Sequence, residues 1–168
     1  MPALVCNTSP LLYLGRIRQT HLLSALFAPV YVPESVAIEL DAGRLIRPDT
    51  IDPRDLDWVT RVPITPALLA GLPPNRLGAG ERGAIAFGLT QPGCIVGLDD
   101  RQARVLAQQL GLAVVGTVGI LVSAKRANLI RAARPLLDAV REQGFRINPE
   151  LYAEALKLAG EEDTSPNR

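Results

Sequence analysis

The chain opens with a short apolar run that ends in a polar turn, Ala3-Leu4-Val5-Cys6-Asn7-Thr8-Ser9-Pro10. Four apolar residues without alternation are typical of a strand that is covered on both faces. Ser9 is a favourable N-cap, and Pro10 suits the first position of a helix because its missing N–H needs no partner there. The stretch therefore predicts a buried strand that leads directly into a helix, the repeating unit of a parallel α/β sheet.

The same alternation continues along the chain. Further strands are expected at 29–32, 94–98 and 113–115, and an edge strand at 58–62 in a proline-rich, less regular stretch. Helices are expected at about 10–14, 20–27, 33–43, 67–69, 78–89, 99–110, 117–127, 133–143 and 149–159. The pattern predicts a single doubly wound α/β domain with a mostly parallel sheet of four or five strands. We expect this domain over residues 1–160 and a polar, flexible tail over 161–168.

Composition bears on the compartment of the protein. The two cysteines, Cys6 and Cys94, lie in apolar runs and match no metal spacing, so we expect small buried hydrophobic side chains in a reducing environment. We find neither a signal peptide nor the run of about 18 apolar residues that a membrane span needs. These features predict a cytoplasmic protein without a membrane partner.

Charge is unevenly distributed although the formal net charge is only +1. Residues 101–146 contain eight Lys or Arg and two acids, whereas the rest of the chain contains ten Lys or Arg and fifteen acids. This distribution fits a metal site formed by the acidic part of the chain next to a phosphate-binding surface formed by the basic residues at 101–146. Solvated helix faces explain the same distribution.

Polar and acidic residues follow the predicted strands or lie in the helices after them: Asn7, Glu39, Glu81, Asp99 and Asp100. Ligands of such sheets bind outside the carboxyl ends of the strands, where the strand order reverses. Carboxylates held close together repel one another unless a cation lies among them. Without His or Cys ligands, the set fits Mg²⁺ or Mn²⁺ better than zinc.

Each of these residues also has a structural explanation. Asp99 and Gln102 have the spacing of a capping box, so a cap of the following helix is the alternative role for Asp99, and Thr117 is placed to cap another helix. Glu81 near a helix start favours the helix macrodipole. Residues 78–83 match the letters of the dinucleotide motif G-x-G-x-x-G, but that motif requires a strand before the glycines, and the prolines at 73–74 argue against one.

Taken together, the motifs resemble the PIN-like domain family, in a prokaryotic subfamily of nucleic-acid-binding proteins whose members are mostly uncharacterised. Four motifs carry the resemblance in the expected order: Val5-Cys6-Asn7-Thr8-Ser9-Pro10-Leu11, Val32-Pro33-Glu34-Ser35-Val36-Ala37-Ile38-Glu39-Leu40, Leu77-Gly78-Ala79-Gly80-Glu81 and Gly97-Leu98-Asp99-Asp100-Arg101. It continues through 116–121 and 144–147, and covers about residues 3–159.

The resemblance implies a ribonuclease that holds Mg²⁺ or Mn²⁺ and cleaves single-stranded RNA, as in VapC-type toxins that pair with an antitoxin protein. Matched by motif, Glu39 and Glu81 correspond to the second and third acids of the family. Asp100 corresponds to the fourth acid, and Asp99 remains an alternative. Thr8 or Ser9 takes the place of the small hydroxyl residue, with Thr117 as a further supporting residue. The resemblance also implies a homodimer, for which the apolar helices at 11–14 and 22–27 offer surfaces.

Asn7 departs from the family pattern, because it stands where the first Asp is usual. An amide oxygen carries no charge, so metal affinity should fall. The expected function is therefore a metal-dependent endoribonuclease, and the alternative is a weak or inactive module that binds nucleic acid or protein. Arg101 and Arg104, one turn apart after the acidic pair, are candidates for contacts with the RNA backbone.

Overall fold

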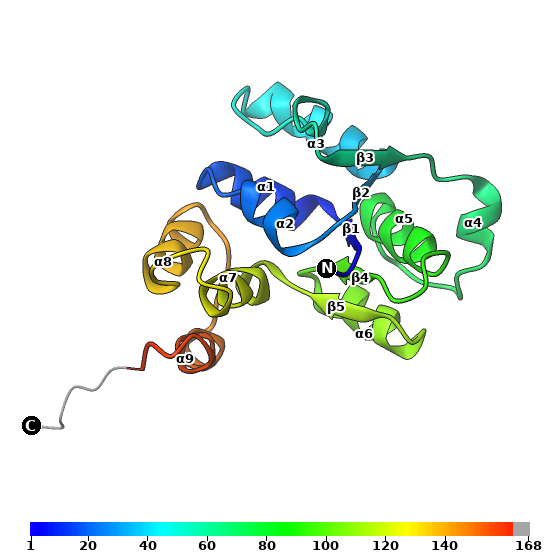
Figure 1. Cartoon of the computed structure of the whole chain (residues 1–168). Helices are drawn as coiled ribbons and strands as arrows, with labels where there is room; N and C mark the ends of the chain where they lie inside the picture. Colours follow the sequence, from blue (N-terminus) through cyan, green and yellow to red (C-terminus); the bar gives the residue numbers. More distant parts are fainter. Residues whose placement is uncertain (163–168) are drawn as a thin grey trace, which may run out of the picture.

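The computed structural model describes residues 1–162 and contains a five-stranded sheet in the order β3-β2-β1-β4-β5 (Figure 1). The strands are β1 (Leu4–Cys6), β2 (Val30–Pro33), β3 (Val59–Val62), β4 (Ile95–Gly97) and β5 (Ala113–Val115). Every neighbouring pair is parallel, and Val5 lies opposite both Tyr31 and Val96. The parallel sheet and the edge strand at Val59–Val62 are thereby confirmed. The predicted tail lies outside the described residues from 163 onward.

Helices connect the strands and cover both faces of the sheet. Their bounds are α1 (Thr8–Arg16), α2 (His21–Leu26), α3 (Glu34–Ile46), α4 (Pro66–Ala70), α5 (Ala79–Gly88), α6 (Arg101–Gln109), α7 (Thr117–Arg126), α8 (Arg134–Glu142) and α9 (Pro149–Leu158), with a 3-10 turn η1 at Pro53–Asp55. Leu4 packs in the cluster formed with α1, α2 and α7–α9, whereas Val5 packs with α5 and α6. Consecutive residues of β1 thus serve opposite faces, as strand geometry requires.

Several predicted helix boundaries are wrong by one to three residues. The first helix begins at Thr8 with Asn7 at the N-cap, so Ser9 and Pro10 lie inside its first turn. The helix after β2 passes Gly43, which was expected to end it, and stops at Ile46. Thr117 is the first residue of α7, and the N-cap is Gly116.

Close packing of α5 places its first turn against the rest of the domain. A Cβ atom on Gly83 would collide with Oγ of Ser35 on α3, and one on Gly88 would lie 2.8 Å from a methyl group of Val96. Because these positions carry no side chain, α5 approaches both α3 and the sheet closely. The helix start therefore lies beside the residues that follow β1.

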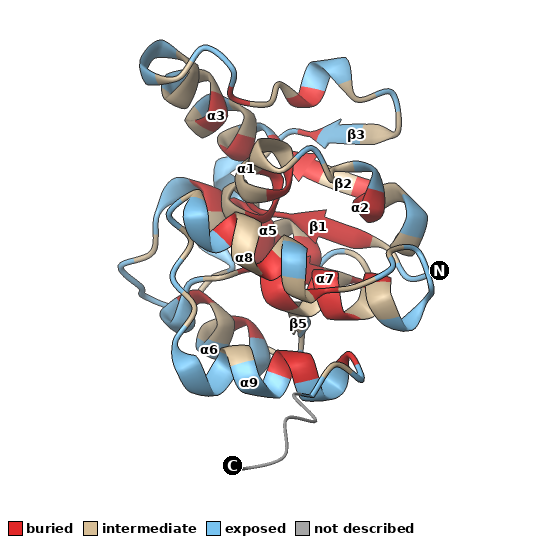
Figure 2. Cartoon of the chain, turned by 90° about the vertical axis from the view of Figure 1, so that its left-hand side faces the viewer, coloured by how far each residue is buried: buried red, intermediate tan, exposed pale blue. Residues whose placement is uncertain are grey.

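The apolar helices expected to serve a dimer interface are instead part of the core. Leu11, Leu14, Leu22 and Leu23 are fully buried within the chain, so that expectation about the surface is wrong. The inner strands and the inward faces of the helices are mostly buried, whereas the edge strand β3 and the outer faces of the helices are largely exposed (Figure 2). Both cysteines are unpaired and buried as expected, and burial raises the pKa of each thiol. Each helix within residues 1–162 is too short or too polar to span a bilayer.

Candidate functional site

The centre of the sheet brings together two chain segments that are far apart in the sequence. The order of strands reverses between β1 and β4, because β2 and β3 lie on one side of β1 and β5 lies beyond β4. Asn7 directly follows β1, and its N–H donates a 3.1 Å hydrogen bond to the carbonyl of Gly97 at the end of β4. Asp99 and Asp100 come two residues later. Ligands of doubly wound folds bind at such a reversal.

Glu39 ties three helices together at this edge. Its Oε2 accepts a hydrogen bond from the Thr8 hydroxyl at the start of α1. Its Oε1 accepts one of 2.8 Å from the backbone N–H of Gly80 at the start of α5. The carboxylate is therefore held in one orientation.

Asn7 lies beside Glu39 with its amide oxygen unpartnered. The residue is 4% exposed, and its Oδ1 is buried without a hydrogen-bond partner among residues 1–162. A Cβ atom added to Gly80 would lie 2.8 Å from this oxygen and 2.6 Å from Oε2 of Glu39, so both oxygens converge on Gly80. A buried acceptor without a donor costs about 1–3 kcal/mol and calls for an explanation such as a ligand.

Glu81 adds a second carboxylate from the first turn of α5. Its Oε2 accepts a 3.0 Å hydrogen bond from the N–H of Gly78, so it also closes the helix start as its position suggested. Burial raises the pKa of Glu81, and the carboxylates of Asp100 and Glu39 raise it further, while the bond from Gly78 opposes the shift. Three carboxylates are therefore close enough to influence one another.

Asp99 and Asp100 are adjacent but have different partners. The expectation that Asp99 caps the following helix is wrong, because α6 begins at Arg101 and Oδ1 of Asp100 accepts a 2.8 Å bond from the N–H of Ala103. Asp99 instead accepts three hydrogen bonds, from the Ser9 hydroxyl at 2.6 Å and from the N–H and hydroxyl of Thr117 at 2.7 Å each. Asp99 therefore links the starts of α1 and α7.

The two candidate arginines lie one turn apart on α6 and line different cavities. Arg101 is exposed and lines a cavity of about 580 Å³ together with Arg76. Arg104 is partly buried, donates a 2.9 Å hydrogen bond to the carbonyl of Leu98, and lines another cavity with Asp99. Both cations lie within reach of the edge that carries the acids.

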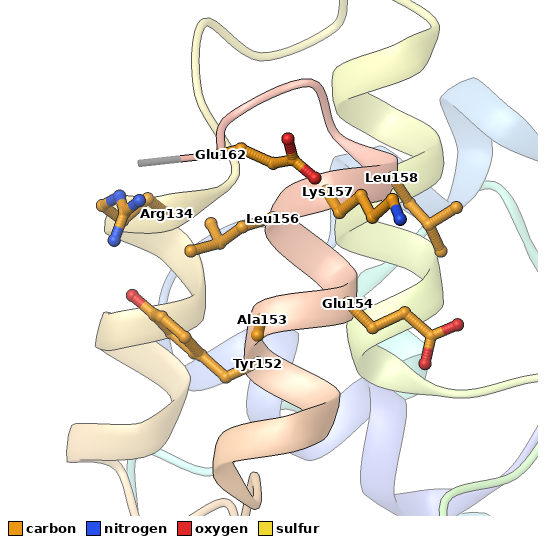
Figure 3. A pocket seen from close by; sticks show the side chains of 8 residues that line it. All are labelled: Arg134, Tyr152, Ala153, Glu154, Leu156, Lys157, Leu158 and Glu162. Atoms are coloured by element: carbon orange, nitrogen blue, oxygen red, sulfur yellow. The ribbon is translucent and has the colours of Figure 1, made fainter. Parts of the chain in front are cut away.

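Another cavity lies away from this edge. It has a volume of about 730 Å³ and is lined by residues of α8, α9 and the segment after α9. Its side chains spread to both sides of α9 instead of converging on one point (Figure 3). Within residues 1–162, no three Asp, Glu, His or Cys side chains form a ready-made metal site. Glu39, Glu81 and Asp100 therefore do not form such a group by themselves, and the unpartnered Oδ1 of Asn7 is the observation that points to a ligand at this edge.

Sequence reasoning missed the role of Gly80, whose backbone N–H orients Glu39. The signal was present in residues 78–83, but their letters pointed to the dinucleotide motif. No strand precedes these glycines, since α4 ends at Ala70 and the residues from there to Gly78 include none. The dinucleotide alternative thus lacks the strand it needs.

A family model described as a PIN domain matches residues 3–161, which is almost the whole chain. Among curated proteins, none matches this chain significantly.

Proposed function

Because this chain belongs to the PIN domain family, which has a nuclease-type fold, we propose that it is a metal-dependent endoribonuclease acting on single-stranded RNA. The observation that carries the proposal is the convergence of the Asn7 amide oxygen and the Glu39 carboxylate on Gly80. Glu81 and Asp100 complete an edge that is rich in oxygen donors.

The donor set fits a hard divalent cation. Mg²⁺ and Mn²⁺ prefer carboxylate and carbonyl oxygens, and the buried Oδ1 of Asn7 has no other partner in the described chain. Asn7, Glu39, Glu81 and Asp100 would hold the ion. When bound, it would activate a water molecule and stabilise negative charge on the phosphate under attack.

The residues of the chain have separate tasks in this proposal. Thr8 and Gly80 fix the orientation of Glu39. Burial raises the pKa of Glu81 and so makes its carboxylate a stronger base, and its Oε1 is the oxygen not engaged by Gly78, so it is suited to accept a proton from the attacking water. Asp99 is a positioning residue that acts through Ser9 and Thr117.

Asn7 supports a second candidate function. A neutral amide gives the site one negative charge fewer than an Asp at this position would. We therefore keep as the alternative a PIN module that binds RNA or protein without cleaving it. Both candidates use Arg101 and Arg104 to hold the negatively charged backbone.

The two candidates are separated by cleavage of labelled single-stranded RNA in the presence of Mn²⁺. Glu81→Gln should lower the rate at least about 100-fold, because it removes the proposed base. Glu150→Gln, an exposed acid in the first turn of α9, is the matched control and should cleave like the wild type. Absence of cleavage by the wild type, or normal cleavage by Glu81→Gln, would reject the nuclease proposal; binding without cleavage would support the alternative.

The partner implied by the resemblance can be tested in cells. A VapC-type toxin should arrest growth when expressed alone in the cytoplasm, and the product of a neighbouring gene should relieve the arrest as its antitoxin. Growth arrest that persists in Glu81→Gln would point away from nuclease toxicity. The proposed homodimer can be measured by light scattering of the purified protein.

A further inference from the structure

A groove of about 550 Å³ begins at the acidic edge and follows one helix away from it. Gly119, Val122, Ser123 and Arg126 line it and lie three or four residues apart, so they share one face of α7. The ten residues of α7 span about 15 Å. The opposite walls come from β5 and from α9, which packs against α7 (Figure 1). Asp99 and Gly116 mark the end of the groove nearest the acids.

Three arginines give the groove its charge: Arg104, Arg126 and Arg146. Arg126 and Arg146 are exposed, and within residues 1–162 neither forms an ion pair with a carboxylate. The acids that line the groove are Asp99 and Glu154. The three arginines outnumber these two acids, so the groove carries a net positive charge.

The rest of the lining is largely apolar. Val115, Val122 and Phe145 contribute to the walls, and Phe145 packs edge-on against Tyr13 with ring centroids 5.0 Å apart. Guanidinium groups together with apolar surface match a single strand, which exposes phosphates and unpaired bases together. Duplex RNA presents mainly its backbone and 2′-hydroxyls, so its bases would not reach these walls.

We propose that the groove between β5, α7 and α9 binds a few nucleotides of single-stranded RNA next to the cleavage site. Arg104, Arg126 and Arg146 contact its phosphates. This inference rests on the proposed function, because it names the path of the same substrate. A peptide or a second copy of the chain could also occupy an apolar groove, but the unpaired arginines and the continuity with the acidic edge favour the polyanion.

Fluorescence anisotropy of a labelled 12-nucleotide single-stranded RNA tests the proposal. EDTA is included so that cleavage cannot interfere. The double variant Arg126→Gln/Arg146→Gln removes two exposed cations, and Arg61→Gln/Arg131→Gln removes the same charge elsewhere, from β3 at the opposite edge of the sheet and from the connection between α7 and α8. We expect the groove variant to bind about tenfold more weakly and the control within about twofold of the wild type.

The salt dependence gives a second readout. Each lost phosphate contact lowers the slope of log K against log salt by about 0.7 for a single strand, so the groove variant should lose about 1.4. Equal affinities and slopes for the two double variants would overturn the proposal, as would a wild type that does not bind RNA. A dimer that dissociates in the groove variant while RNA affinity stays unchanged would assign the groove to a second copy and also overturn it.

Failure of this inference differs from failure of the nuclease proposal. Cleavage by the wild type in Mn²⁺ together with unchanged binding by the groove variant would reject only the groove. Weaker binding by the groove variant together with no cleavage by the wild type would support the groove and reject the nuclease.

Discussion

The backbone N–H of Gly80 donates a 2.8 Å hydrogen bond to Oε1 of Glu39, which joins the start of α5 to the middle of α3. The other oxygen of Glu39 is held by Thr8. Two donors from different helices therefore fix the carboxylate before any ligand binds. Such preorganisation lowers the cost of assembling a site.

Gly80→Ala should disrupt this arrangement. The added methyl group would lie 2.6 Å from Oε2 of Glu39 and 2.8 Å from Oδ1 of Asn7, so it must displace both side chains. We expect the free energy of unfolding to fall by about 1–3 kcal/mol and RNA cleavage to fall at least about tenfold. Urea denaturation measures the first effect and the Mn²⁺ cleavage assay the second.

Gly43→Ala is the matched control for that change. A methyl group there would make an ordinary 3.7 Å contact with Thr50, and the position lies inside α3. This variant should therefore be as stable as the wild type or more stable by about 0.5–1 kcal/mol. Equal behaviour of the two glycine variants would contradict the steric argument.

Asn7→Asp should lower the stability of the metal-free protein and raise its affinity for Mn²⁺. It places a further negative charge beside Glu39 in a buried position, and like charges disfavour ionisation there. In EDTA we expect the Tm to fall, with a loss of about 1 kcal/mol or more in the free energy of unfolding. Mn²⁺ should then raise the Tm of this variant more than that of the wild type, as measured by a thermal-shift titration.

Asn148→Asp controls for the chemical change alone. Asn148 caps α9, and its side chain accepts a bond from the N–H of Leu151, a task that Asp performs equally well. Its Tm and its response to Mn²⁺ should match those of the wild type. An unaltered Mn²⁺ response in Asn7→Asp would argue against Asn7 as a ligand position.

The sequence predicted β1, β2, β4 and β5 well because each is a short continuous apolar run. It predicted helix ends less well. Asp99 and Asp100 are both able to cap, and only the backbone shows that Asp100 occupies the N-cap, with φ −64° and ψ 131°. Gly43 suggested a helix end, but α3 continues past it to Ile46, and a methyl group at this position would make only an ordinary contact with Thr50.

The sequence was enough to name the residues of the candidate site, but not the contacts between them. Strand order and the strand–helix pattern were enough to bring Asn7, Glu39 and Glu81 to one edge. The bond between Gly80 and Glu39 and the unpartnered Oδ1 of Asn7 depend on how closely α5 packs against α3. That distance is set by Gly83 and Ser35, which no local pattern relates to each other.

Glu81→Gln should change stability in a pH-dependent way. Because burial and neighbouring carboxylates raise the pKa of Glu81, the folded state binds this proton more tightly than the unfolded state. The contribution of Glu81 to the free energy of unfolding is therefore fully present below its ordinary pKa of 4.5. It is lost as the pH rises through the pKa that Glu81 has in the folded state. In EDTA at pH 7 the variant should be more stable than the wild type, and near pH 4 the difference should vanish.

Thermal denaturation across this pH range measures the effect, with Glu150→Gln as control. Glu150 lies exposed in the first turn of α9, where its charge favours the helix macrodipole. That control should lose about 0.3–1 kcal/mol at pH 7, which is opposite in sign. A wild type more stable than Glu81→Gln at pH 7 in EDTA would contradict the raised pKa of Glu81 and the loss of stability expected from it.

Asp99→Asn and Asp100→Asn should separate structure from chemistry. Asp99 accepts three hydrogen bonds with its two oxygens, and an amide offers only one acceptor. Asp99→Asn should therefore lower the free energy of unfolding by about 2–3 kcal/mol, since bonds to a charged group are worth about 1.5–3 kcal/mol each. Asn caps a helix as well as Asp does, so Asp100→Asn should change stability by no more than about 0.5 kcal/mol.

Metal binding should show the opposite order. Asp100→Asn removes a charge from the group that influences Glu81, so calorimetric titration should show Mn²⁺ binding about tenfold weaker, with slower RNA cleavage. Asp99→Asn should retain most of its Mn²⁺ affinity under conditions in which it is folded, because its oxygens face Ser9 and Thr117. If Asp99→Asn instead loses Mn²⁺ while Asp100→Asn keeps it, the two residues must exchange the roles assigned to them.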